Sequence, residues 1–183
     1  MRCPLYKARP EGFYRVNQFI TPNDSSVYNK ARELIRYYEN KIEACFNFVS
    51  INIRYVPDKR QYGYGEYWAF PSETLRYRVG DCEDTSFLLA SLLLASGIPD
   101  ENVRVVLGRY NYVGHAWVEV LTNEGWYILE STSDRELTIG YNALKQREGY
   151  QRGYSPELYV YHHSCEQVGR RGLYDRQPLY YYY

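Results

Sequence analysis

Residues 80–86 read Gly-Asp-Cys-Glu-Asp-Thr-Ser, and an apolar run over residues 87–95 follows them. At helical spacing this run leaves almost no polar face, so it predicts a helix that is buried. Gly97 and Pro99 come directly after it, and both residue types favour the end of a helix. The stretch therefore predicts a central buried helix around which the rest of the domain packs.

Cys82 lies in the first turn of this predicted helix, at its polar end. Asp81 is a favoured N-cap residue, and Asp84 stands three positions later, where a capping box carries an acidic side chain. The unpaired N–H groups of a first turn and the helix dipole stabilise a thiolate. We therefore expect the pKa of Cys82 to be lowered, as in a nucleophilic thiol.

A nucleophilic thiol needs a base, and the chain has three histidines. His115 lies within residues 113–121, whose alternating apolar side chains predict a strand. After a turn-like segment at residues 122–125, residues 126–132 predict the second strand of a hairpin. Pairing across this turn places Glu130 diagonally opposite His115 on the same face of the hairpin. We expect the two side chains to lie within reach of one another.

Cys82, His115 and Glu130 thus supply a nucleophile, a base and a carboxylate that orients the base. The blocks that contain them are Gly-Asp-Cys-Glu-Asp, Gly-His-Ala-Trp-Val-Glu-Val and Trp-Tyr-Ile-Leu-Glu-Ser-Thr. In this order they resemble the transglutaminase-like cysteine hydrolase superfamily, in its branch of microbial transglutaminase-like cysteine proteases, over about residues 42–132. The resemblance implies those three catalytic roles and an α+β fold with a papain- or transglutaminase-like core. Aspartate usually stands at the place of Glu130, so the orienting side chain is one methylene longer here.

The segment over residues 67–75 also resembles the stretch that leads into the cysteine in this family. Trp68 has two interpretations. It is either a core residue that anchors this segment, or a donor whose indole N–H binds the oxyanion beside the backbone N–H of Cys82. Together with Tyr67 and Gly114, Trp68 makes up the predicted oxyanion and substrate cleft.

The expected activity is that of a cysteine hydrolase. It would cleave peptide, isopeptide or related amide bonds of a protein or peptide substrate through an acyl-thioester. If an amine accepts the acyl group in place of water, the same residues catalyse transglutamination, and the sequence fits both acceptors. A third alternative is a non-catalytic structural or assembly protein that retains the fold. The tyrosine-rich C-terminal extension and the glutamate at position 130 favour that alternative.

The expected chemistry needs no cofactor, although acidic residues crowd the nucleophile. Capping accounts for Asp81 and Asp84. Asp81 and Glu83 also offer the hard oxygen ligands that Ca²⁺ prefers, so calcium is kept as an alternative to a metal-free site. A cation there would favour the thiolate of Cys82, whereas Glu83 without a cation opposes it.

The chain of 183 residues carries 22 basic and 22 acidic side chains, so its formal net charge is zero. This balance excludes the strongly positive surface typical of nucleic-acid-binding proteins, and no nucleic-acid partner is expected. No apolar run approaches membrane-spanning length, so no membrane partner is expected. The first residues lack the apolar centre of a signal peptide, which favours the cytoplasm. The sequence leaves open whether Cys3 and Cys165 form a disulfide.

The length favours a single domain over residues 1–183, with its core at about residues 23–132. Residues 1–22 contain three prolines and predict an irregular lead-in. Residues 23–49 repeat apolar side chains at helical spacing and predict one amphipathic helix. Residues 133–183 form an extension rich in tyrosine and arginine, which interfaces favour. The extension is expected either to wrap the domain or to mediate self-association.

Shorter elements complete an arrangement of three antiparallel strands over the buried helix. Strands are predicted at residues 51–56, 103–108 and 158–161, and a short helix within residues 134–146. Ser72 is expected to cap another short helix. Glu119 shares a strand face with His115 and is expected to carry surface charge.

Overall fold

The computed structural model describes residues 1–132 and 144–169. Its central antiparallel sheet consists of β5 (Val103–Tyr110), β6 (Val113–Thr122), β7 (Gly125–Leu129), β8 (Leu144–Lys145), β9 (Tyr154–Val160) and β10 (Cys165–Gln167). The strands lie in the order β10-β9-β5-β6-β7-β8. The sheet is wider than the predicted three strands, because the chain after residue 143 adds β8, β9 and β10.

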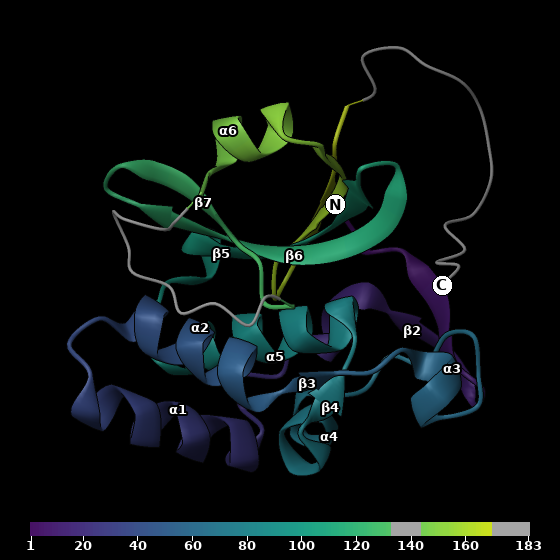
Figure 1. Ribbon diagram of the computed structural model, residues 1–183, viewed down its shortest axis with the longest axis horizontal. Helices are drawn as coiled ribbons and strands as arrows, with labels where there is room; N and C mark the ends of the chain where they lie inside the picture. Colours follow the sequence, from purple (N-terminus) through teal and green to yellow (C-terminus); the bar gives the residue numbers. More distant parts are fainter. Residues whose placement is uncertain (133–143, 170–183) are drawn as a thin grey trace.

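The described helices are α1 (Ser25–Tyr37), α2 (Lys41–Asn52), α3 (Asp58–Gln61), α4 (Pro71–Tyr77), α5 (Cys82–Ala95) and α6 (Gln146–Gln151). Helices α1, α2, α4 and α5 lie on one side of the sheet and α6 lies on the other (Figure 1). This arrangement confirms the predicted α+β fold. Within the described residues, none of the helices has both the length and the apolar character needed to cross a membrane.

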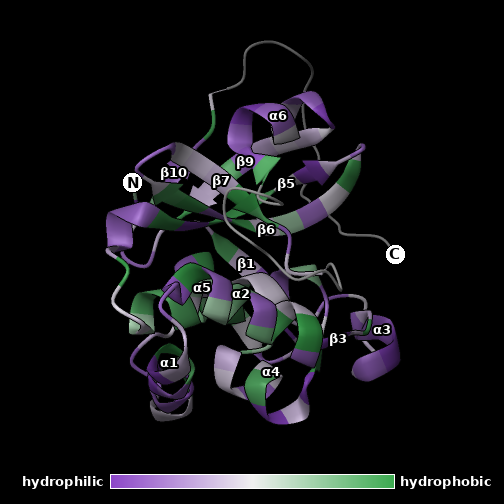
Figure 2. Cartoon of the chain, turned by 60° about the vertical axis from the view of Figure 1, so that its left-hand side comes forward, coloured by the Kyte–Doolittle hydropathy of each residue, from purple (hydrophilic) through white to green (hydrophobic). Residues whose placement is uncertain are grey.

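Helix α5 is the predicted central helix, and almost all of its residues are buried. It packs against α1, α2 and α4 as well as against β5 and β6. Figure 2 shows the hydrophobic colour along α5, between the outer helices and the sheet. Its leucines at positions 88, 89, 92 and 93 are fully buried, and each contributes about 2 kcal/mol to folding by leaving water. This packing fixes the helix end that carries Cys82.

The N-terminal segment forms a β-hairpin, so the prediction of an irregular lead-in is wrong. Strand β1 (Leu5–Arg9) pairs antiparallel with β2 (Gly12–Arg15), and the short 3-10 helix η1 (Val16–Phe19) follows. Pro4 precedes the first strand and Pro10 lies in the turn. The hairpin tolerates both prolines because neither has to donate a hydrogen bond inside a strand.

The single helix predicted over residues 23–49 is also wrong, because α1 and α2 are separate helices. Asn40 lies between them and caps α2, where its side chain accepts hydrogen bonds from the N–H groups of Ile42 and Glu43. Asparagine is among the strongest N-cap residues, so it starts a new helix at this point. Apolar side chains recur at helical spacing on both sides of Asn40, so the sequence pattern did not indicate that one helix ends and another begins there.

Two short elements differ from their predictions. The strand predicted at residues 51–56 is reduced to β3 (Arg54–Tyr55), because α2 extends into its first residues. Strand β3 pairs in parallel with β4 (Val79–Gly80), directly before α5. Helix α4 begins at Pro71 and is not capped by Ser72. Proline is favoured at the first position of a helix, since its fixed φ matches and its missing N–H is not needed there.

The hairpin of β6 and β7 has the predicted register. Thr122 pairs with Gly125, and the pairing continues along both strands. The register brings Glu130, directly after β7, diagonally opposite His115 at the start of β6. This part of the sequence prediction is confirmed.

The C-terminal extension joins the sheet where the structure describes it. Strand β9 contains most of the strand predicted at residues 158–161. The helix predicted within residues 134–146 falls largely outside the described residues, and so do the last tyrosines of the chain. Self-association through the extension therefore stays a prediction.

Two of the four cysteines form a disulfide that the sequence left open. Cys3, in the N-terminal segment, is joined to Cys165 at the start of β10. The bond closes a loop of most of the chain and ties the extension to the N-terminal hairpin. Cys45 is a buried free thiol in the core, as expected from its place on an apolar stripe.

Glu119 is fully buried between the sheet and α6, so the predicted surface position is wrong. Arg104 donates to its Oε2 from Nε at 2.9 Å and from Nη2 at 2.7 Å. Further donors are Trp117, Gln146 and Tyr150. The predicted alternation of faces along β6 was correct, but α6 covers the sheet at Glu119, where solvent had been expected.

Candidate active site

Cys82 is the first residue of α5, as predicted, and its side chain is buried. The thiol donates a hydrogen bond to Oε2 of Glu83, with 3.2 Å between the two atoms. Burial and the negative charge of Asp81 raise the pKa of Cys82 above that of a free thiol. The predicted lowering is wrong here, because desolvation and the surrounding carboxylates outweigh the helix dipole.

The two aspartates beside Cys82 do not cap α5 as predicted. Asp81 occupies the N-cap position, but its side chain makes no cap hydrogen bond. Oδ1 of Asp84 accepts a hydrogen bond from the backbone N–H of Ala69 at 2.7 Å. Asp84 therefore connects the start of α5 to the segment before α4.

His115 and Glu130 form the predicted contact. Nε2 of His115 lies 2.7 Å from Oε2 of Glu130. Burial raises the pKa of Glu130, but hydrogen bonds from His115 and Thr132 outweigh it, so the pKa is lowered overall. Glu130 is thus an ionised acceptor that fixes the orientation of the imidazole ring.

The strand that carries His115 also contacts the nucleophile. The backbone N–H of Ala116, the next residue, forms a hydrogen bond to the thiol of Cys82 and favours its thiolate. Within the described chain, no hydrogen bond joins the thiol to the imidazole ring. Because Nε2 of His115 is engaged by Glu130, Nδ1 is the nitrogen that remains to accept the thiol proton.

Trp68 occupies the core, in line with the first of its two predicted interpretations. Its side chain is 2% exposed and packs against the rings of Tyr6, Phe19 and Phe87. Its indole Nε1 donates to Oε2 of Glu66 at 3.1 Å. The indole N–H is therefore occupied by a carboxylate.

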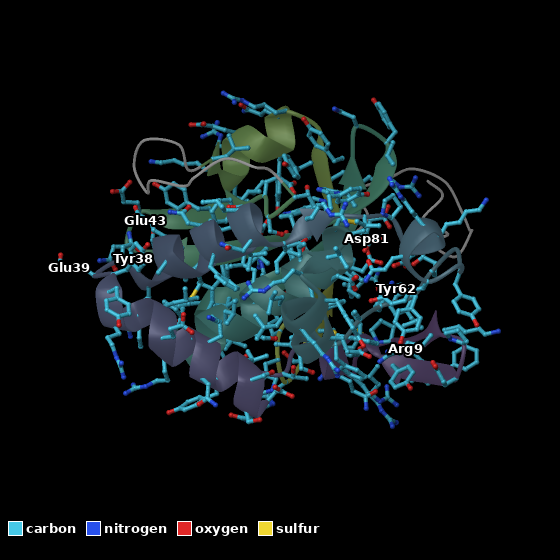
Figure 3. The ribbon with its side chains drawn as sticks, turned by 60° about the horizontal axis from the view of Figure 1, so that its bottom comes forward. Arg9, Tyr38, Glu39, Glu43, Tyr62 and Asp81 are labelled. Carbon is cyan, nitrogen blue, oxygen red and sulfur yellow. A yellow bond between two sulfur atoms is a disulfide. The ribbon has the colours of Figure 1, made fainter. Side chains whose placement is uncertain are left out.

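The other two predicted cleft residues lie in separate places. Tyr67 stacks on Tyr62, with 3.9 Å between ring centroids. Its backbone N–H donates to Asp58, and its hydroxyl accepts from Arg9. Figure 3 shows Arg9, Tyr62 and Asp81 at the same end of the molecule. Gly114 precedes His115 in β6, so only Gly114 adjoins the base directly.

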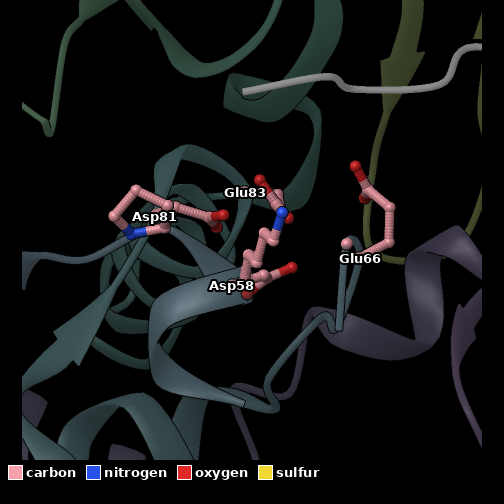
Figure 4. A pocket seen from close by; sticks show the side chains of 7 residues that line it. Asp58, Glu66, Asp81 and Glu83 are labelled. Carbon is pink, nitrogen blue, oxygen red and sulfur yellow. The ribbon is translucent and has the colours of Figure 1, made fainter. Parts of the chain in front are cut away.

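An acidic cluster lies beside the nucleophile. Carboxylate oxygens of Asp58, Asp81 and Glu83 lie within 4.8 Å of one another, and Glu66 lines the same pocket (Figure 4). Burial and the charge of Asp81 raise the pKa of Asp58 to about 8, and burial raises that of Glu66 to about 7. Carboxylates gathered in this way repel one another unless they share protons or a cation.

The residues of this pocket fit a hard divalent cation. Asp58 Oδ1 and Asp81 Oδ1 are buried without a hydrogen-bond partner among the described residues. The pocket has space of about 20 Å³ for a water-sized sphere, enough for one ion or water. Its donors are oxygens, which hard cations such as Ca²⁺ prefer. Asp58 thus joins Asp81 and Glu83, which the sequence had already suggested as ligands.

Comparison with known proteins identifies the family. The model of the transglutaminase-like superfamily matches residues 15–131, which contain all three predicted catalytic residues. The chain belongs to the transglutaminase-like superfamily. A search of the curated proteins finds no match.

Solved structures with this transglutaminase-like fold include LapG of Legionella pneumophila. It is 18% identical, with a TM-score of 0.57 over 84% of this chain and 86% of LapG. EGTA-treated LapG is 19% identical, with a TM-score of 0.56 over 86% of each chain. Calcium-bound LapG is 18% identical, with a TM-score of 0.52 over 80% of this chain and 90% of LapG. At these identities the likeness shows the fold.

Sequence reasoning missed three residues around the predicted site of this transglutaminase-like domain. Asp58 is the first residue of α3 and Glu66 lies in the irregular segment that follows this helix, and only the tertiary fold brings them to the end of α5. Tyr154 comes from β9, outside the residues that the family model matches, and its hydroxyl donates to Oε2 of Glu130 at 2.9 Å. No local pattern distinguishes Tyr154 from the many other tyrosines of the extension.

Proposed function

We propose that this protein is a cysteine peptidase that cleaves peptide, isopeptide or related amide bonds through an acyl-thioester on Cys82. The observation that carries the proposal is the 2.7 Å contact between His115 Nε2 and Glu130 Oε2. His115 is followed in β6 by Ala116, whose backbone N–H forms a hydrogen bond to the thiol of Cys82. Membership of the transglutaminase-like superfamily supports the same assignment.

In the proposed reaction, Nδ1 of His115 accepts the thiol proton, and the Cys82 sulfur attacks the carbonyl carbon of the substrate. Collapse of the tetrahedral intermediate breaks the C–N bond, and the His115 imidazolium protonates the departing amine. Water then attacks the acyl-thioester with His115 as base, which releases the acid and restores the thiol. Glu130 keeps its charge throughout and stabilises the imidazolium.

The oxyanion of the intermediate needs donors that are already in position. The backbone N–H of Cys82 is one candidate, because the first N–H groups of a helix have no partner within the helix. The indole of Trp68 is not one, since it donates to Glu66.

Calcium binding is part of the proposal. LapG has been solved calcium-bound, and in this chain Asp58, Asp81 and Glu83 would hold the ion. A bound divalent cation would supply positive charge beside the sulfur and so favour the thiolate. The ligand role of Glu83 competes with its hydrogen bond to the thiol, so this side chain couples the two sites.

The proposal is tested with peptide and isopeptide libraries, read by mass spectrometry in the presence of Ca²⁺ or EGTA. Wild-type protein is expected to release new amine and acid termini, and Cys82→Ala is expected to release none. Products that incorporate an added primary amine would assign transglutamination in place of hydrolysis. Absence of both products, with Cys82→Ala indistinguishable from wild type, contradicts the enzymatic assignment.

A non-catalytic function is favoured by one specific observation. The thiol is buried and hydrogen-bonded to a carboxylate, which is an inert arrangement unless Glu83 moves. Under this alternative, addition of Ca²⁺ leaves the reactivity of Cys82 unchanged. If Ca²⁺ does not change the reactivity of Cys82, the domain would serve as a structural support for the C-terminal extension.

For localisation, we propose an oxidising compartment in place of the expected cytoplasm. The disulfide between Cys3 and Cys165 supports this proposal, because cytosolic thiols are normally kept reduced. Mass spectrometry of protein alkylated at the moment of cell lysis tests it. Free Cys3 and Cys165 thiols in protein from its native source would contradict it.

A further inference from the structure

Glu130 receives hydrogen bonds on both of its carboxylate oxygens. His115 Nε2 and the Tyr154 hydroxyl lie 2.7 Å and 2.9 Å from Oε2. The backbone N–H of Thr132 donates to Oε1 at 3.1 Å, and the hydroxyl of the same residue donates there as well. The plane of this carboxylate is therefore fixed from two sides.

Tyr154 reaches Glu130 from a part of the chain outside the family core. It is the first residue of β9, and the family model ends at residue 131. Its ring packs edge-on against Trp117, with 5.1 Å between ring centroids, and against Tyr110 at 4.5 Å. The side chain is 8% exposed. These contacts leave the hydroxyl one direction, toward Glu130.

The start of β9 is itself held firmly. Tyr154 pairs with Tyr110 in β5, and the backbone N–H of Asn111 donates to the carbonyl of Gly153 at 3.1 Å. Gly153 has a φ of +110°, a conformation that favours glycine. The turn before Tyr154 is thus specified by its own residue type and by a hydrogen bond to the β5–β6 turn.

We propose that Tyr154 is a positioning residue of the candidate active site, which orients Glu130 and through it the imidazole of His115. The start of β9 then helps to orient Glu130, so this part of the extension is more than a cover for the sheet. This inference rests on the proposed function, because it assigns Tyr154 a role in the same triad.

The proposal explains how a carboxylate on the long side chain of a glutamate is held in one position. The extra methylene adds a rotatable bond, so a glutamate carboxylate samples more positions than an aspartate one. Tyr154 and Thr132 remove that freedom by holding one oxygen each. Burial and the charge of Glu130 raise the pKa of Tyr154, so its hydroxyl remains a donor at neutral pH.

The test compares Tyr154→Phe with Tyr159→Phe, a matched control from the same strand. The control removes a hydroxyl that bonds Tyr150 and not Glu130. The probe is p-nitrophenyl acetate, used in the presence of Ca²⁺. This ester acetylates the Cys82 sulfur and releases p-nitrophenolate. We expect Tyr154→Phe to lower the acylation rate constant about tenfold or more with little change in KM, as expected for loss of a hydrogen bond to a charged group. Tyr159→Phe is expected to keep the wild-type rate.

A spectroscopic readout needs no turnover. The Nε2–H proton of His115 is expected as a downfield imidazole resonance in proton NMR, absent from His115→Ala. In Tyr154→Phe this resonance broadens by faster exchange with water, and in Tyr159→Phe it persists. Thr132→Val, which removes a donor from the other oxygen, is expected to act in the same direction as Tyr154→Phe.

A double-mutant cycle with Glu130→Asp separates positioning from general destabilisation. The shorter side chain withdraws the carboxylate from the Tyr154 hydroxyl, so Tyr154→Phe should have a smaller effect in that background. Two outcomes overturn the inference. In the first, the rate effects of Tyr154→Phe and Glu130→Asp simply multiply in the double variant; in the second, Tyr154→Phe keeps both the rate and the NMR resonance of wild type. If wild-type protein itself shows no acylation at Cys82, the proposed function fails instead, and the NMR comparison still decides whether Tyr154 orders Glu130 and His115.

Discussion

The thiol of Cys82 donates to Oε2 of Glu83, with 3.2 Å between sulfur and oxygen. The nucleophile is therefore bound to an acidic neighbour from its own helix, while His115 is bound to Glu130. Burial and the charge of Asp81 raise the pKa of Glu83 well above its ordinary value, so what this side chain offers the thiol is an acceptor for its proton. The proposed triad has its His115–Glu130 contact, but the thiol proton is directed toward Glu83.

The first prediction concerns Glu83 itself. Glu83→Ala removes the acceptor that holds the thiol proton in the 3.2 Å hydrogen bond, so Cys82 should be alkylated at least several-fold faster in EGTA than in wild type. The matched control is Glu39→Ala on the opposite end of the molecule from Asp81 (Figure 3), which should leave the rate unchanged. Equal rates in Glu83→Ala and Glu39→Ala would show that the hydrogen bond to Glu83 does not restrain the thiol.

The acidic cluster predicts an unusual dependence of stability on pH. The pKa of Asp58 is raised from 3.8 to about 8 in the folded protein. The folded state then binds more protons than the unfolded chain between these two values, so this group lowers the free energy of unfolding as pH rises across that window. In EGTA, wild-type protein should lose stability relative to Asp58→Asn between about pH 4 and pH 8.

The measurement is thermal unfolding of both proteins over this pH range. Ca²⁺ at pH 8 should raise the Tm of wild type more than at pH 5, because the ion displaces protons that are bound at low pH. Asp58→Asn should respond weakly to the ion. A wild-type protein whose stability rises relative to Asp58→Asn toward pH 8 contradicts the assigned pKa shift.

Arg104 and Glu119 give a prediction about stability alone. Glu119→Ala leaves the guanidinium of Arg104 buried without its partner, and removing one member of a buried pair costs about 3–5 kcal/mol. Arg104 also lies between the rings of Trp126 and Tyr159, which prevents it from turning out to solvent. Urea unfolding measures the loss, with Glu124→Ala on the exposed β6–β7 turn as control. A loss below about 1 kcal/mol would fit a surface pair and contradict the buried network.

The sequence predicted the central helix, the β6–β7 hairpin and the contact between His115 and Glu130, because each follows from local periodicity and turn chemistry. It failed where tertiary contacts decide. Trp68 donates to Glu66 across the acidic pocket, and Glu119 is buried by an α6 helix with no strong pattern of its own. Desolvation of Cys82 likewise depends on packing, so the helix dipole alone gave the wrong direction for its pKa.

The C-terminal extension shows the same limit. Its tyrosines look alike in sequence, yet Tyr154 donates to Glu130, Tyr150 donates to Glu119, and Tyr159 contacts the hydroxyl of Tyr150. The bulge of β5 against β9 between Leu107 and Gly108 sets which tyrosine reaches which carboxylate. No periodicity encodes such a register shift.

The most direct test of the central claim is the rate of thiol alkylation at Cys82 against pH, read by mass spectrometry with the buried thiol of Cys45 as internal reference. With Ca²⁺, Cys82 should react fast well below the ordinary thiol pKa of about 8.5, slowly in EGTA, and slowly in His115→Ala under both conditions. If Cys82 reacts at the rate of Cys45, and neither Ca²⁺ nor His115→Ala changes that rate, the result would contradict a thiolate–imidazole pair and therefore the proposed peptidase activity.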